Sequence, residues 1–481
     1  MTLTSPDLMR TDAYIDGAWT AADCGCTFEV KNPATGALIE RVADCGGADT
    51  ERAVVAAHRA FAPWSRLPAG KRARLLYKWY DLQKQHLTDL TQLLTAEQGK
   101  PLAEAKGEIL YGMSFVKWFA EEARRAYGET IPSPARDQRI TTIKQPVGVV
   151  AAITPWNFPH AMITRKIAPA LAAGCTVVLK PAEDTPLSAL ALAQLAHEAG
   201  FPPGVINVLP TSDPADVGSA MTRSPLVRKL SFTGSTRVGR LLMEQCAPTL
   251  KKLSLELGGN APFIVFNDAD LDAAVAGGMA AKYRNAGQTC ICVNRFYVQA
   301  GVYAAFVKKL TSATRALTVG NGSEAGVEVG PLINRAGHDK VTRLVQQALA
   351  QGAQRTTGAP TDEGLYYTPT VLADVTPGMD LHQEEIFGPV AAVYRFETEA
   401  EVLALANDTP FGLASYFYTR DVARCWRVAE ALEYGMVGVN SGSISTPVAP
   451  FGGVKQSGFG REGSHYGLAE FMTVKYMNWG V

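Results

Sequence analysis

The stretch VGVVAAITPWNFPHAMITRKIAPALAAGCTVVLKPAE, residues 147–183, decides the fold. Two short apolar runs, Val147–Ile153 and Thr176–Leu179, lie on either side of a helical segment over Ala161–Ala173. Apolar strands separated by a helix are typical of a parallel sheet that is covered on both faces. The stretch therefore predicts one unit of an α/β domain.

The same alternation continues on the C-terminal side. We expect two further strands and two helices in this domain, at Val205–Leu209, Lys229–Phe232, Ser188–Ala199 and Arg237–Gln245. A second α/β region begins after Gly258, with strands at Ala261–Phe266, Arg295–Gln299 and Val437–Asn440 and helices at Leu271–Lys282 and Val302–Ala316. Two α/β domains leave a cleft between them, which is a common place for a ligand.

On the N-terminal side the pattern is helical from Ala53 to Tyr127, because Ala, Leu and charged residues dominate and β-branched runs are few. The polar segment Ile131–Lys144 alternates in strand fashion and lies between regions of different texture. We expect it to be a hairpin that reaches out of the first domain.

The composition excludes several classes of protein. Hydrophobic residues make up 47% of the 481 residues and charged residues 19%, which indicates large buried cores and excludes a disordered chain. Lys plus Arg and Asp plus Glu each total 46, so the formal charge of zero predicts neither a nucleic-acid nor a membrane partner. The eight cysteines are too scattered for a disulfide framework, and the N-terminus has no signal-peptide pattern. We therefore expect a reduced, cytoplasmic protein.

Three short segments contain residues suited to covalent and acid–base chemistry. In KKLSLELGG, 251–259, a strand that buries the leucines aims Glu256 the opposite way, as a general base or as a solvated carboxylate. In NAGQTCIC, 285–292, no metal-ligand spacing is present, so Cys290 is a structural thiol or a nucleophile. In ITPWNFP, 153–159, Asn157 offers a donor for an oxyanion or caps the following helix.

Two other turns suit a nucleotide. FTGSTRVG, 232–239, combines a strand, a Gly-rich turn and a helix start, as at a phosphate site, although it is not the G-x-G-x-x-G fingerprint. Lys180 and Glu183 follow another strand and could bind ribose hydroxyl groups, or they form a surface charge pair.

Taken together, PWNFP, LKPAEDTP, FTGSTRVG, LELGGNAP, NAGQTC, EEIFGPV and PFGGVKQSGFGREG resemble the aldehyde dehydrogenase superfamily, in that family's order and over nearly the whole chain. The resemblance implies an aldehyde dehydrogenase-like α/β fold, with two doubly wound α/β domains and a β-strand oligomerisation extension that builds a homodimer or homotetramer. It places the NAD(P)-binding domain at 1–125 and 146–256, the catalytic domain at 257–446, and the extension at 126–145 and 466–481.

The resemblance also implies roles for single residues. Cys290 resembles the nucleophile that attacks the aldehyde, Asn157 and the Cys290 backbone N–H resemble the oxyanion donors, and Glu256 resembles the base for thioester hydrolysis. The implied cofactor is NAD, with NADP as the alternative, because an anionic Glu183 would repel a 2′-phosphate. The implied cofactor contacts are Trp156, Lys180, Glu183, Gly234, Ser235, Glu385 and Phe387.

Within the superfamily, AMITRK, KYRNAGQTCIC, GMVGVN and KQSGFGREGSHYG are most similar to succinate-semialdehyde dehydrogenases. Arg165 and Arg284 match the two arginines that bind the far carboxylate of the substrate, and Ser445 matches the assisting hydroxyl. A surface ion pair is the alternative for either arginine. Pro447 is not expected in the substrate loop, so glutarate semialdehyde or another ω-oxo acid stays open as the substrate.

Two other classes are alternatives. One is a cysteine acyl-transfer or hydrolytic enzyme, which lacks an obvious histidine partner because His160 is the only nearby candidate in the sequence, and the other is a non-catalytic binding protein that has kept the fold. The intact set of Cys290, Glu256 and Asn157 favours the dehydrogenase. In an extended segment Cys292 would lie on the same side as Cys290, which makes it a candidate redox partner; a small core residue is the alternative.

Overall fold

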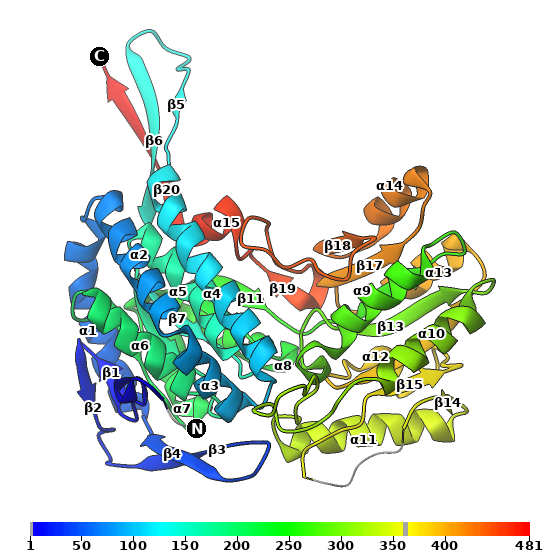
Figure 1. Cartoon of the computed structure of the whole chain (residues 1–481). Coiled ribbons are helices and arrows are strands. Elements are labelled where there is room, and N and C mark those ends of the chain that lie inside the picture. Colours follow the sequence, from blue (N-terminus) through cyan, green and yellow to red (C-terminus); the bar gives the residue numbers. More distant parts are fainter. Residues whose placement is uncertain (1–2, 359–363) are drawn as a thin grey trace.

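The computed structural model describes residues 3–358 and 364–481, which form two large sheets and a smaller one (Figure 1). The first large sheet is eight-stranded, in the order β19 (Gly458–Phe459), β11 (Lys252–Glu256), β10 (Val227–Thr233), β7 (Val149–Ile153), β8 (Thr176–Lys180), β9 (Ile206–Val208), β1 (Ala13–Ile15) and β2 (Ala18–Thr20). Its central strands β11, β10, β7, β8 and β9 are parallel, as the sequence predicts.

Helices cover both faces of this sheet because its strands are apolar on both sides. Val150 and Ala152 of β7 pack into one core with helices α5 (Pro159–Ala173) and α6 (Leu187–Ala199). Val149 and Ala151 pack into the opposite core with α1 (Gly47–Ser65), α7 (Pro214–Arg223) and α8 (Thr236–Cys246). Three more helices pack outside α5 and α6: α2 (Ala69–Gln85), α3 (Leu87–Gln98) and α4 (Leu102–Glu122).

The second large sheet is seven-stranded and also has a core on each face. Its order is β14 (Gln354–Arg355), β15 (Thr370–Ala373), β16 (Val390–Phe396), β13 (Val293–Gln299), β12 (Ala261–Val265), β17 (Ala414–Tyr418) and β18 (Met436–Val439). The helices of this region are α9 (Leu271–Tyr283), α10 (Tyr303–Arg315), α11 (Arg335–Ala350), α12 (Asp380–Gln383), α13 (Glu399–Asn407) and α14 (Val422–Ala431). The predicted fold class, with two doubly wound α/β regions, is confirmed.

A three-stranded antiparallel sheet projects from one end of the molecule (Figure 1). The strand β6 (Gln138–Pro146) pairs with β5 (Thr130–Ile131) on one side and with β20 (Met472–Gly480) on the other. The short helix α15 (Ser464–Ala469) precedes β20. The predicted hairpin at Ile131–Lys144 therefore exists, and the C-terminal segment pairs with it.

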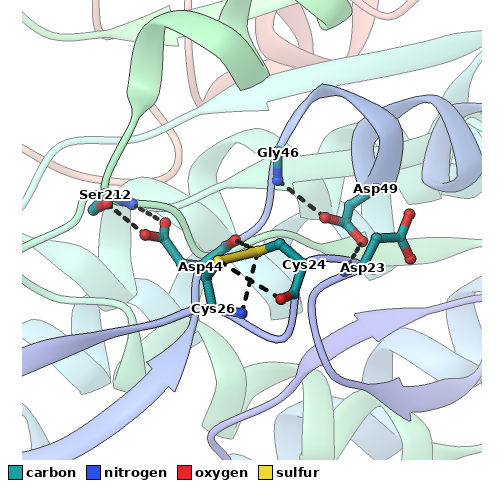
Figure 2. The surroundings of a disulfide bond; sticks show 7 residues. All are labelled: Asp23, Cys24, Cys26, Asp44, Gly46, Asp49 and Ser212. Atoms are coloured by element: carbon teal, nitrogen blue, oxygen red, sulfur yellow. Dashed lines mark hydrogen bonds between the residues drawn. A yellow bond between two sulfur atoms is a disulfide. The ribbon is translucent and has the colours of Figure 1, made fainter.

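A disulfide joins Cys24 and Cys26 in an exposed loop before the hairpin of β3 (Thr27–Lys31) and β4 (Leu38–Ala43). Figure 2 shows this bond beside Asp44, which accepts hydrogen bonds from Ser212. The expectation that all cysteines are reduced is therefore wrong for Cys24 and Cys26. The sequence did not predict this disulfide because a single pair of cysteines separated by one residue does not resemble a disulfide framework. Among the described residues no helix is long and apolar enough to span a membrane.

Candidate active site

The parallel register brings the ends of three strands to one edge of the first sheet. Ile153 of β7 lies opposite Phe232 of β10, and Thr233 lies opposite Glu256 of β11. The carboxyl ends of parallel strands are where α/β proteins bind ligands. The segments that follow these strands contain Trp156, Asn157, Gly234 and Ser235, and these residues line a cleft of about 690 Å³.

The other wall of this cleft comes from the second α/β region. Cys290, Glu385 and Phe387 line it. The rings of Trp156 and Phe387 meet edge to face at 5.6 Å. The structure therefore brings together the predicted nucleophile Cys290, the predicted oxyanion donor Asn157 and five of the seven predicted cofactor residues.

Asn157 is held on both its side chain and its backbone. Its amide Nδ2 donates to the Gln288 carbonyl at 3.0 Å, and its own carbonyl accepts from Asn285 Nδ2 at 2.9 Å. Because an amide nitrogen has two N–H donors, one remains for a ligand. The alternative interpretation as a helix cap is wrong, since Phe158 occupies the N-cap position of α5.

Cys290 lies in a turn that follows a strained backbone. Asn285 and Ala286 have φ of 53° and Gly287 has φ of 74°, and left-handed non-glycine residues cost roughly 1–2 kcal/mol each. A Cβ on Gly287 would lie 2.2 Å from the Gly388 carbonyl oxygen, so only glycine fits there. Strain of this kind clusters at functional sites.

Burial raises the pKa of the Cys290 thiol to about 12, although Arg165 and Arg284 act to lower it. The thiol is therefore protonated at neutral pH in this arrangement. A nucleophilic Cys290 needs a proton acceptor nearby.

Glu256, at the end of β11, is 3% exposed. Neither of its carboxylate oxygens has a hydrogen-bond partner among the described residues. Burial, and next the negative charge of Glu462, raise the pKa of Glu256 well above its usual value. The solvated strand-face alternative is wrong because the sheet is covered on both faces, and an unpartnered buried carboxylate is typical of a functional acid or base.

Cys292 is not arranged as the extended segment predicts. Its backbone N–H donates to the Thr289 carbonyl at 2.9 Å, which makes residues 289–292 a turn. Its buried Sγ lies 3.3 Å from the Lys282 carbonyl. The argument that Cys290 and Cys292 share a side of a strand is therefore wrong, and the surroundings of Cys292 are those of a small core residue.

The cleft fits a dinucleotide. A Cβ on Gly234 would lie 2.4 Å from the ring of the buried Phe232, so only glycine fits at this position of the cleft. Ser235 caps the 11-residue helix α8, whose first-turn N–H groups suit a phosphate. Glu385 accepts from the Gly259 N–H at 3.0 Å, and burial raises its pKa to about 7.

Two predicted cofactor residues lie at the end of the neighbouring strand β8, whose last residue Lys180 pairs with Ile153 of β7. Lys180 and Glu183 are not among the described residues that line the cleft. They form an ion pair at 3.0 Å, but Lys180 is buried and only Glu183 is exposed, so the pair is not the surface charge pair of the alternative interpretation. Sequence reasoning missed Arg237, Asn334 and Lys340 in the cleft wall. Arg237 lies in the quoted FTGSTRVG segment and could have been found as a cation in the first turn of α8.

The predicted substrate residues meet on the other side of Cys290. Arg165, Arg284 and Ser445 line a cavity of about 20 Å³ with Cys290, and Arg284 and Ser445 also line an adjoining cavity of about 110 Å³. Arg165 forms a buried ion pair with Glu462 at 2.5 Å, not a surface pair. Tyr111 of α4 lines the smaller cavity and was not predicted, because an aromatic residue in a helix is usually a core residue.

The hydrolytic alternative lacks its histidine. His160 is buried in α5, and a Cβ on Gly112 of α4 would lie 2.3 Å from its Nδ1. Burial lowers its pKa to about 3. No histidine is found among the described residues that line the cleft and the two cavities. The described residues also contain no cluster of His, Cys, Asp and Glu that could hold a metal ion.

Comparisons with known proteins agree with this fold. A sequence profile described as "Aldehyde dehydrogenase family" matches residues 19–477. The chain is 58% identical to "3-sulfolactaldehyde dehydrogenase" of Pseudomonas putida, over 99% of this chain and 98% of that protein. It is 56% identical to an Escherichia coli succinate-semialdehyde dehydrogenase whose name specifies NADP(+), over 99% of each. The crystal structure of succinate-semialdehyde dehydrogenase from Burkholderia pseudomallei superposes with a TM-score of 0.99, at 57% identity and over 100% of both chains.

Proposed function

The chain belongs to the aldehyde dehydrogenase family, and from this premise we propose that it oxidises succinate semialdehyde to succinate. Glutarate semialdehyde or another ω-oxo acid is the alternative substrate. One observation carries the proposal: Cys290 lines both the large cleft and the cavity that contains Arg165 and Arg284. A thiol at that junction has space for a dinucleotide on one side and two cations for a far carboxylate on the other.

In the proposed reaction, the Cys290 thiol releases its proton to water in the cleft, and the resulting thiolate Sγ adds to the aldehyde carbon. The second N–H of Asn157 and the backbone N–H of Cys290 stabilise the oxyanion. When bound, NAD(P) supplies the hydride acceptor that allows the adduct on Cys290 to become a thioester. Glu256 then takes a proton from water, which attacks the thioester and releases the acid. The raised pKa of Glu256 makes its ionised form a stronger base than an exposed glutamate.

Absorbance at 340 nm tests this function. The protein is mixed with NAD or NADP and with succinate semialdehyde, glutarate semialdehyde or butanal. We expect NADH or NADPH formation with the highest kcat/KM for an aldehyde that carries a carboxylate. A kcat/KM for butanal equal to that for both semialdehydes would contradict the carboxylate part of the proposal.

We propose NAD as the preferred cofactor, with NADP also accepted. Glu183 supports this because its carboxylate repels a 2′-phosphate, while Lys180 at 3.0 Å offsets part of its charge. We expect Glu183→Ser to shift the kcat/KM ratio toward NADP. An unchanged ratio would exclude Glu183 as the residue that discriminates between the two cofactors.

We further propose three domains. Residues 1–125 and 146–256 form the NAD(P)-binding domain, residues 257–446 form the catalytic domain, and residues 126–145 and 466–481 form the oligomerisation extension; the division into three sheets supports this proposal.

A homodimer or homotetramer that assembles through the third sheet is supported by the exposed apolar side chains of Val474, Tyr476 and Trp479. A cytoplasmic location is supported by six cysteines that remain free thiols. Light scattering of the purified protein tests the assembly.

A further inference from the structure

A fully buried ion pair lies beside the candidate active site and has no part in the chemistry described above. Lys100 sits in the turn between α3 and α4, and its Nζ lies 2.5 Å from Glu108 Oε2. The side chains of both residues are 0% exposed. Burying two charges carries a desolvation cost that their attraction often fails to exceed, so stability alone gives little reason for such a pair.

The lysine reaches the oxyanion donor. Lys100 Nζ donates to the backbone carbonyl of Asn157 at 2.7 Å, and Asn285 Nδ2 donates to the same carbonyl at 2.9 Å. A carbonyl oxygen has two lone pairs, so both are used. The peptide plane that follows Asn157 is thereby fixed from two sides.

The glutamate fixes the chain just beyond Asn157. Glu108 Oε1 accepts from the backbone N–H groups of His160 at 2.9 Å and Ala161 at 3.2 Å. These groups belong to the first turn of α5, where a carboxylate also interacts favourably with the helix dipole. Lys100 and Glu108 therefore hold the segment from Asn157 to Ala161 as one unit.

The same part of the chain is anchored to the nucleophile loop. Glu104 Oε2, one helical turn before Glu108, accepts from the Asn285 backbone N–H at 2.8 Å. The backbone of residues 99–100 is also packed tightly, since a Cβ on Gly322 would lie 2.7 Å from the Lys100 carbonyl oxygen. The start of α4 thus contacts both the Asn157 loop and the loop that leads to Cys290.

We propose that Lys100 and Glu108 are positioning residues that hold the Asn157 amide in register with Cys290. This inference rests on the proposed function, in which Asn157 stabilises the oxyanion. Lys100 and Glu108 do not touch the substrate; they act through the backbone of Asn157. An oxyanion donor works only when it is held in place before charge develops, and this pair supplies that restraint.

Stopped-flow absorbance at 340 nm on the full chain tests the inference, with saturating NAD and succinate semialdehyde. We expect Lys100→Met to slow the NADH burst roughly tenfold or more, because a misplaced oxyanion donor loses much of its effect. In an Asn157→Ala background the same change should slow the burst by less than roughly threefold, since the group through which Lys100 acts is already gone. Equal factors in both backgrounds would overturn the inference.

Two further variants separate positioning from folding. Lys100→Met/Glu108→Leu removes both charges, so its Tm should return toward that of the wild type while its burst stays slow. A burst that recovers together with Tm would overturn the inference.

Lys229→Met is the matched control, because Lys229 is another buried lysine, paired with Glu470 at 3.4 Å. It should lower Tm and leave the burst within roughly twofold of the wild type. A tenfold slower burst in this control would show that any buried lysine matters, and would also overturn the inference.

The wild-type trace separates the two claims. An NADH burst in the wild type together with an unchanged burst in Lys100→Met overturns the positioning role and leaves the proposed function intact. A wild type that forms no NADH with any aldehyde overturns both.

Discussion

Asn157 and Glu256 follow or end strands of the same sheet, yet their surroundings differ sharply. The Asn157 carbonyl accepts from Lys100 and Asn285, and its amide donates to Gln288. The Glu256 carboxylate has no hydrogen-bond partner among the described residues. The difference matches two kinds of catalytic work: an oxyanion donor must be fixed beforehand, whereas a base must stay able to accept a proton.

The largest effect is expected from the loss of the Cys290 thiol, because both Asn157 and Glu256 are proposed to act on the adduct that forms at Cys290. Cys290→Ala should abolish NADH formation, because no covalent adduct can form, while NAD still binds. Steady-state absorbance at 340 nm and calorimetric titration with NAD measure the two effects. Retained turnover in Cys290→Ala would show that Cys290 is not the nucleophile, and that Asn157 and Glu256 do not act on an adduct at Cys290.

The next largest effect is expected at Asn157, the residue that is held by hydrogen bonds on its backbone and side chain. Asn157→Ala should slow the NADH burst about 100- to 1000-fold, as expected when one oxyanion donor is lost. The KM for NAD should change little, since the loss falls on the reacting carbonyl. A variant that raises only KM, with a normal burst, would show that Asn157 binds the ligand and does not stabilise charge.

A smaller effect, on the recognition of the substrate carboxylate, is expected from the replacement of Arg284. Arg284→Ala should cost about 2 to 4 kcal/mol in kcat/KM for succinate semialdehyde and little for butanal. Arg165→Ala is expected to act likewise but leaves Glu462 without its guanidinium partner, so Arg284 is the cleaner test. Equal losses for the two aldehydes would indicate a structural role.

The smallest expected effect is on stability, where the Tm of Glu256→Gln should depend on pH relative to the wild type and the Tm of Asn157→Ala should not. In the folded chain the pKa of Glu256 is raised above its ordinary value of 4.5, so its contribution is favourable below pH 4.5 and is lost as the pH rises through the raised pKa. Glutamine does not titrate. Glu256→Gln should therefore match the wild-type Tm near pH 4 and exceed it by roughly one to a few degrees at alkaline pH. Asn157→Ala should lower Tm equally at every pH, and a Tm of Glu256→Gln that falls with pH relative to the wild type would contradict the pKa direction.

Much of this was accessible from the sequence. The apolar runs around ITPWNFP predicted the strand–helix–strand unit, which is confirmed. The family resemblance implied Asn157, Glu256 and Cys290 as the catalytic set, and of these Asn157 and Cys290 line one cleft. What the sequence could not supply depends on long-range contacts. The ion pair between Arg165 and Glu462 joins residues far apart in the chain. The turn at Cys290 follows Asn285 and Ala286, which both have a positive φ. Asparagine tolerates this conformation, but nothing in the sequence predicts it for Ala286.

The proximity of Lys100 to Asn157 was equally hidden. A lysine in a helical stretch is usually solvated, and its burial is decided by α4 packing on α5. The pairing of Lys180 with Glu183 shows the opposite case, where two residues close in sequence meet as a simple local charge pair.

The most direct test of the central claim is the stopped-flow trace of Glu256→Gln with NAD and succinate semialdehyde at 340 nm. We expect a burst of about one NADH per active site at near wild-type rate, followed by steady turnover slowed roughly 100-fold or more, because the base acts only after the thioester forms. A trace in which burst and steady turnover slow together, as in Asn157→Ala, would contradict the separation of roles between the fixed donor and the free carboxylate.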